Sequence, residues 1–140
     1  MIAPSLLSAD FAHLSQEMEW FNRSKADWLH LDIMDGVFVP NISFGFPVLK
    51  YVAELCTKPL DVHLMIENPL DYIADFKKAG ADIITFHIES SSPAGETVDK
   101  IIECGCKAGI SIKPATPAEE VFPYLDKLSM VLVMTVEPGF

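Results

Sequence analysis

The chain of 140 residues has the composition of one globular domain, because 50% of its residues are hydrophobic and 21% are charged. This balance excludes a disordered or collagen-like protein. Twenty acidic residues against ten basic ones give a net charge of −10, and such a surface repels phosphate groups. We therefore expect neither nucleic acid nor membrane partners.

The three cysteines are Cys56, Cys104 and Cys106. Their odd number and irregular spacing do not match a disulfide scaffold, so they indicate reduced thiols and a cytoplasmic protein. The first residues lack the basic start of a signal peptide. No apolar run reaches the roughly 18 residues of a membrane span.

Apolar runs rich in Ile, Val and Leu alternate with amphipathic segments along the chain. The expected strands are residues 2–7, 28–34, 60–66, 83–88, 108–112 and 130–136. The expected helices are residues 10–24, 47–56, 69–79, 95–104 and 117–125. Three of these helices begin with a proline in the first turn.

Three residues mark helix ends in this pattern. Asn68 and Thr116 stand directly before Pro69 and Pro117 and are expected to act as N-caps. Gly80 is expected to end the helix that precedes it.

Six strands that alternate with five helices predict parallel βαβ units, an α/β fold and one domain over residues 1–140. The segment 7–10 (LSAD) lacks the glycine pattern of an open dinucleotide-binding sheet. We therefore expect a (β/α)₈ TIM barrel. Because such barrels typically take about 250 residues, the chain is expected to contain about six of the eight βα units, an incomplete barrel.

Two of the expected strands carry polar residues at alternate positions, which share one face because side chains alternate along a strand. One face of 28–34 carries His30, Asp32 and Met34, and one face of 60–66 carries Asp61, His63 and Met65. Two imidazoles with a carboxylate can bind a divalent metal ion. The alternative is that each histidine is a hydrogen-bonded interior residue.

Residues 35–45 are too long for a minimal turn after a strand, and they contain Gly, Pro and Asn at intervals. This pattern predicts an ordered loop at an active site. Asp35 and Asn41 are expected to fix the loop through hydrogen bonds to the backbone. His87 is expected to lie behind the site or to be structural, the alternative being that it reaches the site. Lys113 is expected to be a charge at the barrel rim, the alternative being that it helps to position an anion.

Four stretches of the chain form a specific set of motifs in a fixed order. They are residues 3–7 (APSLL), 30–45 (HLDIMDGVFVPNISFG), 61–65 (DVHLM) and 133–140 (VMTVEPGF). Together they resemble the ribulose-phosphate 3-epimerase family. The resemblance implies a TIM barrel of the ribulose-phosphate-binding type and an isomerase of the pentose phosphate pathway. Such an enzyme interconverts D-ribulose 5-phosphate and D-xylulose 5-phosphate by proton transfer at C3 through a cis-enediolate.

The resemblance also implies a set of site residues. His30, Asp32 and His63 match ligands of one divalent metal ion (Zn²⁺, Fe²⁺, Mn²⁺ or Co²⁺), and Asp32 also matches a catalytic acid/base. The residues that match substrate-binding positions are Ser5, His63, Gly139 and Phe140. The residues that match cavity-lining positions are Met34, Met65 and Met134. The expected partners are a phosphorylated ketopentose and further copies of the chain in a homo-oligomer.

The chain departs from the family in lacking two parts of the expected site, the second acid/base aspartate and most of the phosphate-binding loops. The second acid/base aspartate, which is also the fourth metal ligand, comes from a seventh strand that these residues do not contain. We therefore expect the 140 residues alone to be inactive. Two alternatives remain open, namely a D-allulose-6-phosphate 3-epimerase and an inactive fragment that binds a metal or another ligand.

Overall fold

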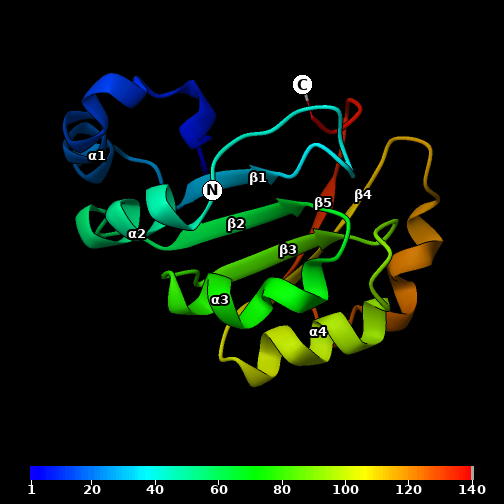
Figure 1. Ribbon diagram of the computed structural model, residues 1–140. Coiled ribbons are helices and arrows are strands. Elements are labelled where there is room, and N and C mark those ends of the chain that lie inside the picture. The colour runs from blue at the N-terminus through cyan, green and yellow to red at the C-terminus, as the bar shows by residue number, and fades with distance from the viewer. Residues whose placement is uncertain (140) are drawn as a thin grey trace.

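The structure, a computed structural model, describes residues 1–139 and contains a parallel five-stranded sheet (Figure 1). Its strands are β1 (Leu29–Met34), β2 (Leu60–Met65), β3 (Ile83–His87), β4 (Lys107–Ile112) and β5 (Met130–Val133). They are paired in chain order, from β1 to β5. The predicted strands between residues 28 and 112 are confirmed with small changes at their ends, and the last predicted strand is shorter than expected.

Helical segments connect these parallel strands. The α-helices are α1 (Leu14–Arg23), α2 (Phe46–Leu55), α3 (Ile73–Lys78) and α4 (Ala94–Glu103). The 3₁₀-helices are η1 (Leu6–Ser8), η2 (Phe11–His13), η3 (Pro69–Tyr72) and η4 (Ala118–Tyr124). Helices α2, α3 and α4 lie along one side of the sheet (Figure 1). Within residues 1–139, no helix is long and apolar enough to cross a membrane.

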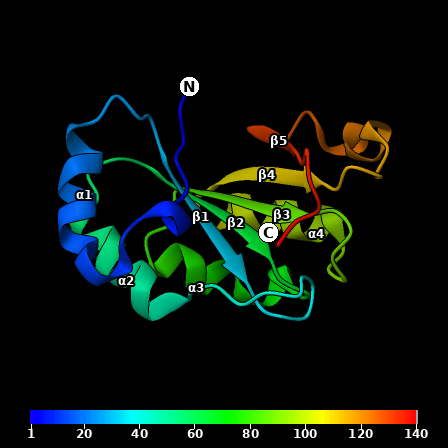
Figure 2. The ribbon, with the colours of Figure 1, turned by 90° about the horizontal axis from the view of Figure 1, so that it is seen from above.

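The order of the strands confirms the predicted fold class. Every strand pairs with the next one along the chain, whereas an open doubly wound sheet reverses its order at a switch point. The strand directions turn progressively from β1 through β4 when the sheet is viewed from above (Figure 2). This is the arrangement of successive βα units in a TIM barrel.

The prediction of a strand at residues 2–7 is wrong. Only Ser5 forms a β-bridge, with His30 of β1, and the chain then turns into η1. Pro4 has no N–H to donate to a neighbouring strand, and the Ser5 hydroxyl accepts a hydrogen bond from the N–H of Leu7 at 3.3 Å. This local cap favours the turn over an extended strand.

The expected end of the sheet and the helix before it also differ from the structure. Residues 118–124 form a 3₁₀-helix with Pro123 inside it, because proline disrupts the hydrogen bonds of an α-helix. The strand predicted at 130–136 ends at Val133. Its pairing partner β4 ends at Ile112, and Pro114 follows two residues later.

The predicted helix ends are partly correct. Gly80 ends the helical segment and adopts a φ of +111°, and a Cβ atom there would lie 2.6 Å from the Cβ of Ala53. The predicted caps are wrong, because Asn68 makes no side-chain capping bond and Pro117 occupies the capping position before η4. The Thr116 hydroxyl instead donates to the carboxylate of Glu89.

The two faces of the sheet differ in polarity. The face toward the helices is apolar, and its side chains join the main hydrophobic core. Among them are Leu31, Val62, Leu64, Ile84, Phe86 and Ile110, all fully buried. The alternate positions carry the polar residues of β1, β2 and β3, so the predicted alternation places the candidate site residues together on the inner face.

Candidate active site and metal centre

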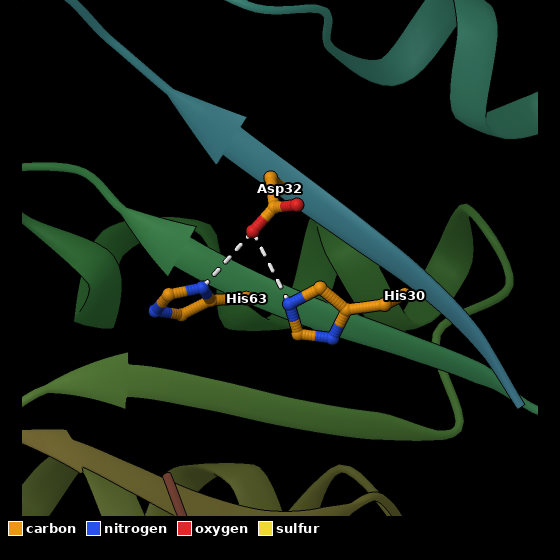
Figure 3. Close-up of side chains that lie close together, drawn as sticks. All are labelled: His30, Asp32 and His63. Carbon is orange, nitrogen blue, oxygen red and sulfur yellow. Dashed lines mark hydrogen bonds and ion pairs between the residues drawn. The ribbon is translucent and has the colours of Figure 1, made fainter. Parts of the chain in front are cut away.

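Three predicted ligands meet on the inner face where β1 and β2 run side by side (Figure 3). Asp32 of β1 lies opposite His63 of β2 in the register, and His30 lies one step earlier, opposite Asp61. One ligand atom from each of His30, Asp32 and His63 lies within 4.8 Å of the others. The structure thus confirms that these three residues form one cluster.

The carboxylate of Asp32 is at the centre of this cluster. Its Oδ1 lies 3.2 Å from Nε2 of His30 and 3.2 Å from Nδ1 of His63. Its Oδ2 accepts a 2.5 Å hydrogen bond from the hydroxyl of Ser5. The structure therefore brings Ser5 into the site, through contact with Asp32.

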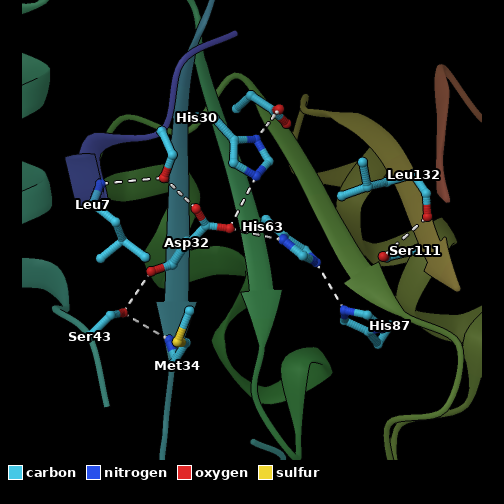
Figure 4. Close-up of polar contacts among 11 residues, drawn as sticks. Leu7, His30, Asp32, Met34, Ser43, His63, His87, Ser111 and Leu132 are labelled. Carbon is cyan, nitrogen blue, oxygen red and sulfur yellow. Dashed lines mark hydrogen bonds and ion pairs between the residues drawn. The ribbon is translucent and has the colours of Figure 1, made fainter. Parts of the chain in front are cut away.

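The outward ring nitrogens of both histidines are also engaged (Figure 4). Nδ1 of His30 lies 2.7 Å from Oδ2 of Asp61, and Nε2 of His63 lies 3.0 Å from Nε2 of His87. If these nitrogens carry the protons, both imidazole lone pairs and an Asp32 oxygen face a common point. Three electron-pair donors at one point fit a divalent cation, and ligand histidines are usually held in this way.

The charges of the site follow from burial and from these contacts. Burial opposes ionisation of Asp32, but hydrogen bonds from His30 and Ser5 hold the pKa of its carboxyl well below the usual range. Burial also opposes the charged form of His30, yet Asp32 and Asp61 raise the pKa of His30 to about 9. Burial dominates at His63 and lowers its pKa. In the absence of a metal ion, a proton on His30 balances the Asp32 carboxylate, so metal binding would release that proton.

Two of the three expected methionines lie directly beyond the cluster. Met34 and Met65 are paired in the register and form a small buried cluster with Val39, against which Phe38 packs. Met134 follows β5, is half-buried and is not part of that cluster. The geometry thus places apolar side chains from β1, β2 and the following loop at the carboxyl end of the site.

The loop at 35–45 is held as predicted. Asp35 accepts hydrogen bonds from the backbone N–H groups of Val37, Phe38 and Glu67. Burial opposes ionisation of Asp35, but these bonds outweigh it and lower the pKa of its carboxyl. Ser43, which the sequence pattern did not single out, donates to the carbonyl of Asp32 at 2.6 Å and accepts from the Met34 N–H at 3.0 Å. The loop is therefore tied to the backbone of the site strand.

The end of the described chain packs against the same loop. Asn41 donates to the carbonyl of Gly139 at 3.3 Å and accepts from the N–H of Ile42. Gly139 has a φ of +96°, and a Cβ atom there would lie 2.7 Å from the Cβ of Val39. Only glycine fits this close approach. Phe140, the last predicted substrate-binding residue, lies outside the described residues.

Sequence reasoning assigned no role to Glu89. Its carboxylate approaches Nδ1 of His87 at 3.1 Å and accepts hydrogen bonds from the N–H of Lys113 and the hydroxyl of Thr116. The signal was the spacing of two residues between His87 and Glu89 at the end of a strand, which favours the same face. Lys113 itself places its ammonium group 4.3 Å from the ring centre of Phe38.

Comparison with known proteins gives a consistent result. A model of the ribulose-phosphate 3-epimerase family matches residues 1–140. The chain is 49% identical over 142 residues to a ribulose-phosphate 3-epimerase of Treponema pallidum, and 50% identical over 143 residues to a cytoplasmic isoform of that enzyme from Oryza sativa. These alignments cover 99% of the chain and 64% and 63% of the respective relatives.

A solved structure supports the fold independently. A mutant tryptophan synthase alpha-subunit from Pyrococcus furiosus superposes with a TM-score of 0.67 over 94% of this chain and 62% of that chain, at 17% sequence identity. At this identity the likeness concerns the fold alone. The chain thus spans less than two thirds of the length of each of these proteins.

Proposed function

The chain belongs to the ribulose-phosphate 3-epimerase family, and from this we propose that it carries the metal centre and one acid/base group of a metal-dependent 3-epimerase. The substrates would be D-ribulose 5-phosphate and D-xylulose 5-phosphate. The observation that carries the proposal is the convergence of His30, Asp32 and His63 on the inner face of β1 and β2. The same proposal includes a cytoplasmic location and a homo-oligomer.

The two imidazoles and the Asp32 carboxylate would hold one divalent ion, of Zn²⁺, Fe²⁺, Mn²⁺ or Co²⁺. When bound, the ion supplies positive charge that stabilises the negative charge developing on the substrate oxygen. His30 and His63 are held for this role by contacts to Asp61 and His87.

Asp32 would move the proton at C3 of the substrate. Its low pKa keeps it ionised at neutral pH, as a base requires, and Ser5 holds its Oδ2 at 2.5 Å. Inversion at C3 needs a second group on the opposite face of the planar intermediate. The family resemblance assigns that group to an aspartate on a later strand than the five described here.

The apolar side chains beyond Asp32 would exclude water from the intermediate. Met34 and Met65 are buried and pack with Val39, and thioethers compete weakly for a hard cation. Exclusion of water strengthens the electrostatic interactions that stabilise the negatively charged enediolate. Gly139, next to Val39, would contribute to substrate binding through its backbone.

Proton exchange at C3 in D₂O tests this function. The full-length protein should exchange the C3 hydrogen of D-ribulose 5-phosphate for deuterium and form D-xylulose 5-phosphate, as followed by NMR. Removal of metal with a chelator should abolish exchange, and added Zn²⁺, Fe²⁺, Mn²⁺ or Co²⁺ should restore it. Unchanged exchange after complete metal removal would contradict the metal centre, and preference for D-allulose 6-phosphate would contradict the substrate.

A further inference from the structure

A chain of polar contacts extends from the metal centre to the loop after β4. It runs from Nδ1 of His63 through its Nε2 to Nε2 of His87 at 3.0 Å, and from Nδ1 of His87 to Oε2 of Glu89 at 3.1 Å. Both imidazoles are buried, with exposures of 1% for His63 and 0% for His87. Figure 4 shows the two rings end to end between β2 and β3.

The position of each proton in this chain of contacts follows from the Glu89 carboxylate at its outer end. An ionised carboxylate only accepts hydrogen bonds, and a neutral imidazole has one N–H and one lone pair. Glu89 therefore requires the proton of His87 on Nδ1, which leaves Nε2 of His87 as an acceptor. For His63 to donate to that acceptor it carries its proton on Nε2, and the lone pair of its Nδ1 then faces the point between Oδ1 of Asp32 and Nε2 of His30 where a metal ion would lie.

Glu89 is well held for this task. Its Oε1 accepts a 2.7 Å hydrogen bond from the N–H of Lys113 and another from the hydroxyl of Thr116. Burial opposes ionisation of Glu89, but the bonds from His87, Lys113 and Thr116 lower its pKa to about 2. The carboxylate is thus anchored to the loop after β4 and is charged at neutral pH.

We propose that Glu89 and His87 are positioning residues that fix the tautomer of His63 and keep its Nδ1 available for a metal ion. The inference rests on the proposed function only in naming a metal ion as the ligand. His30 is held directly by the carboxylate of Asp61 at 2.7 Å, whereas His63 is held by a carboxylate through an intervening imidazole. The orientation of His63 therefore depends on the loop at 113–116, through the contacts of that loop with Glu89.

The substitution Glu89→Gln reverses the proton positions. A glutamine has one side-chain oxygen, which the Lys113 N–H and the Thr116 hydroxyl occupy, so its NH₂ group faces Nδ1 of His87. His87 must then accept there and carry its proton on Nε2. Nε2 of His63 becomes an acceptor, and its proton moves to Nδ1, where it competes with a metal ion.

The direct test is the tautomer of His63 in the metal-free full-length protein, read from the imidazole ¹⁵N chemical shifts. The chain contains four histidines, so the signals can be assigned by substitution. We expect the Nε2–H form of His63 in the wild type and the Nδ1–H form in Glu89→Gln. A destabilising effect on the fold alone would not change the tautomer of a histidine that remains buried.

Calorimetric titration with Zn²⁺ alone gives the second readout. Loss of a residue that orients a ligand histidine typically weakens metal binding about 10- to 100-fold, and we expect this for Glu89→Gln. The matched control Glu103→Gln removes the same charge from an exposed position at the end of α4 and should leave the affinity unchanged.

The outcomes separate the two proposals. An Nδ1–H tautomer of His63 in the wild type, or an affinity of Glu89→Gln equal to that of Glu103→Gln, would overturn the positioning role. If Glu89→Gln does not fold, the wild-type tautomer still decides. An Nε2–H tautomer of His63 in a protein that binds no Zn²⁺ would support the hydrogen-bond chain and contradict the metal centre of the proposed function.

Discussion

The two faces of one sheet are stabilised in different ways. On β2, Leu64 points into the hydrophobic core, while its neighbour His63 points to the opposite face, and both are buried. Leu64 is stabilised by contact with many apolar neighbours, an interaction without direction. His63 makes a directed hydrogen bond to His87 through Nε2 and turns its Nδ1 toward Asp32.

The two kinds of position tolerate different substitutions. An apolar position tolerates side chains of similar volume, whereas a buried polar group needs a partner of defined chemistry at a defined distance. Substitutions on the outer face should therefore change stability, and substitutions on the inner face should change metal binding and chemistry. Four substitutions test this contrast, in order of decreasing expected effect.

Asp32→Asn should have the largest effect, on chemistry. The amide keeps the size of the side chain but cannot accept the C3 proton, and loss of a general base commonly lowers the rate by about 10²–10⁴-fold. Deuterium exchange at C3 with the metal-loaded full-length protein measures this, and far-UV circular dichroism checks that the variant is folded. A wild-type exchange rate would show that Asp32 is not the base.

Leu64→Ala should have the largest effect on stability. Removing a fully buried leucine costs about 2–5 kcal/mol of the free energy of unfolding, because a cavity remains. Urea denaturation measures this loss, and the Zn²⁺ affinity of the folded protein should not change. Val133→Ala on β5 is the control, since Val133 is 60% exposed and should change stability by less than about 0.5 kcal/mol. Equal losses in both variants would contradict the contrast.

Asp61→Asn should weaken metal binding without removing a ligand. Asp61 holds Nδ1 of His30 at 2.7 Å, and loss of such a partner weakens affinity by about 10–100-fold. Titration of the metal-free protein with Zn²⁺ measures the change. An unchanged affinity would mean that the orientation of His30 is set by packing and not by this carboxylate.

Asp35→Asn should have the smallest effect, and one that depends on pH. Despite burial, the N–H groups of Glu67, Val37 and Phe38 lower the pKa of Asp35 in the folded protein. The stabilisation is therefore present above the unfolded pKa of about 4 and is lost as pH falls through the folded value. Wild type should exceed the variant by about 1 kcal/mol in unfolding free energy at pH 7, and this difference should shrink as the pH falls below the unfolded pKa and through the folded one. A constant difference would contradict the ionic origin.

Much of the site was readable from short-range patterns. The alternation along 28–34 and 60–66 predicted that His30, Asp32 and His63 share a face, and the structure brings them within 4.8 Å. Asp35 and Asn41 were predicted to bind backbone groups of their own loop, and they do. These predictions succeeded because a strand period and a turn are set by residues close in sequence.

Contacts between distant residues were not readable in this way. Thr116 has the sequence position of a helix cap, yet its hydroxyl donates to Glu89, 27 residues earlier in the chain. Residues 2–7 have the composition of a strand, yet Pro4 and the Ser5 hydroxyl turn the chain after one bridge. At Thr116 the fold brought a distant acceptor near, whereas at residues 2–7 a proline and a local hydrogen bond ended an apolar pattern that favours a strand.

The sequence by itself therefore determined the alternation of strands and helices, the two faces of each strand, and the three residues that can bind a metal ion. Only the tertiary structure decided which second residue holds each histidine, because hydrogen bonds require a separation of about 3 Å and no local pattern specifies that distance. Two features of the packing bring these partners to that distance. The parallel register sets Asp32 beside His63, and β3 lies close to the loop after β4. The contacts of Asp61, His87 and Glu89 with the site arise from that packing.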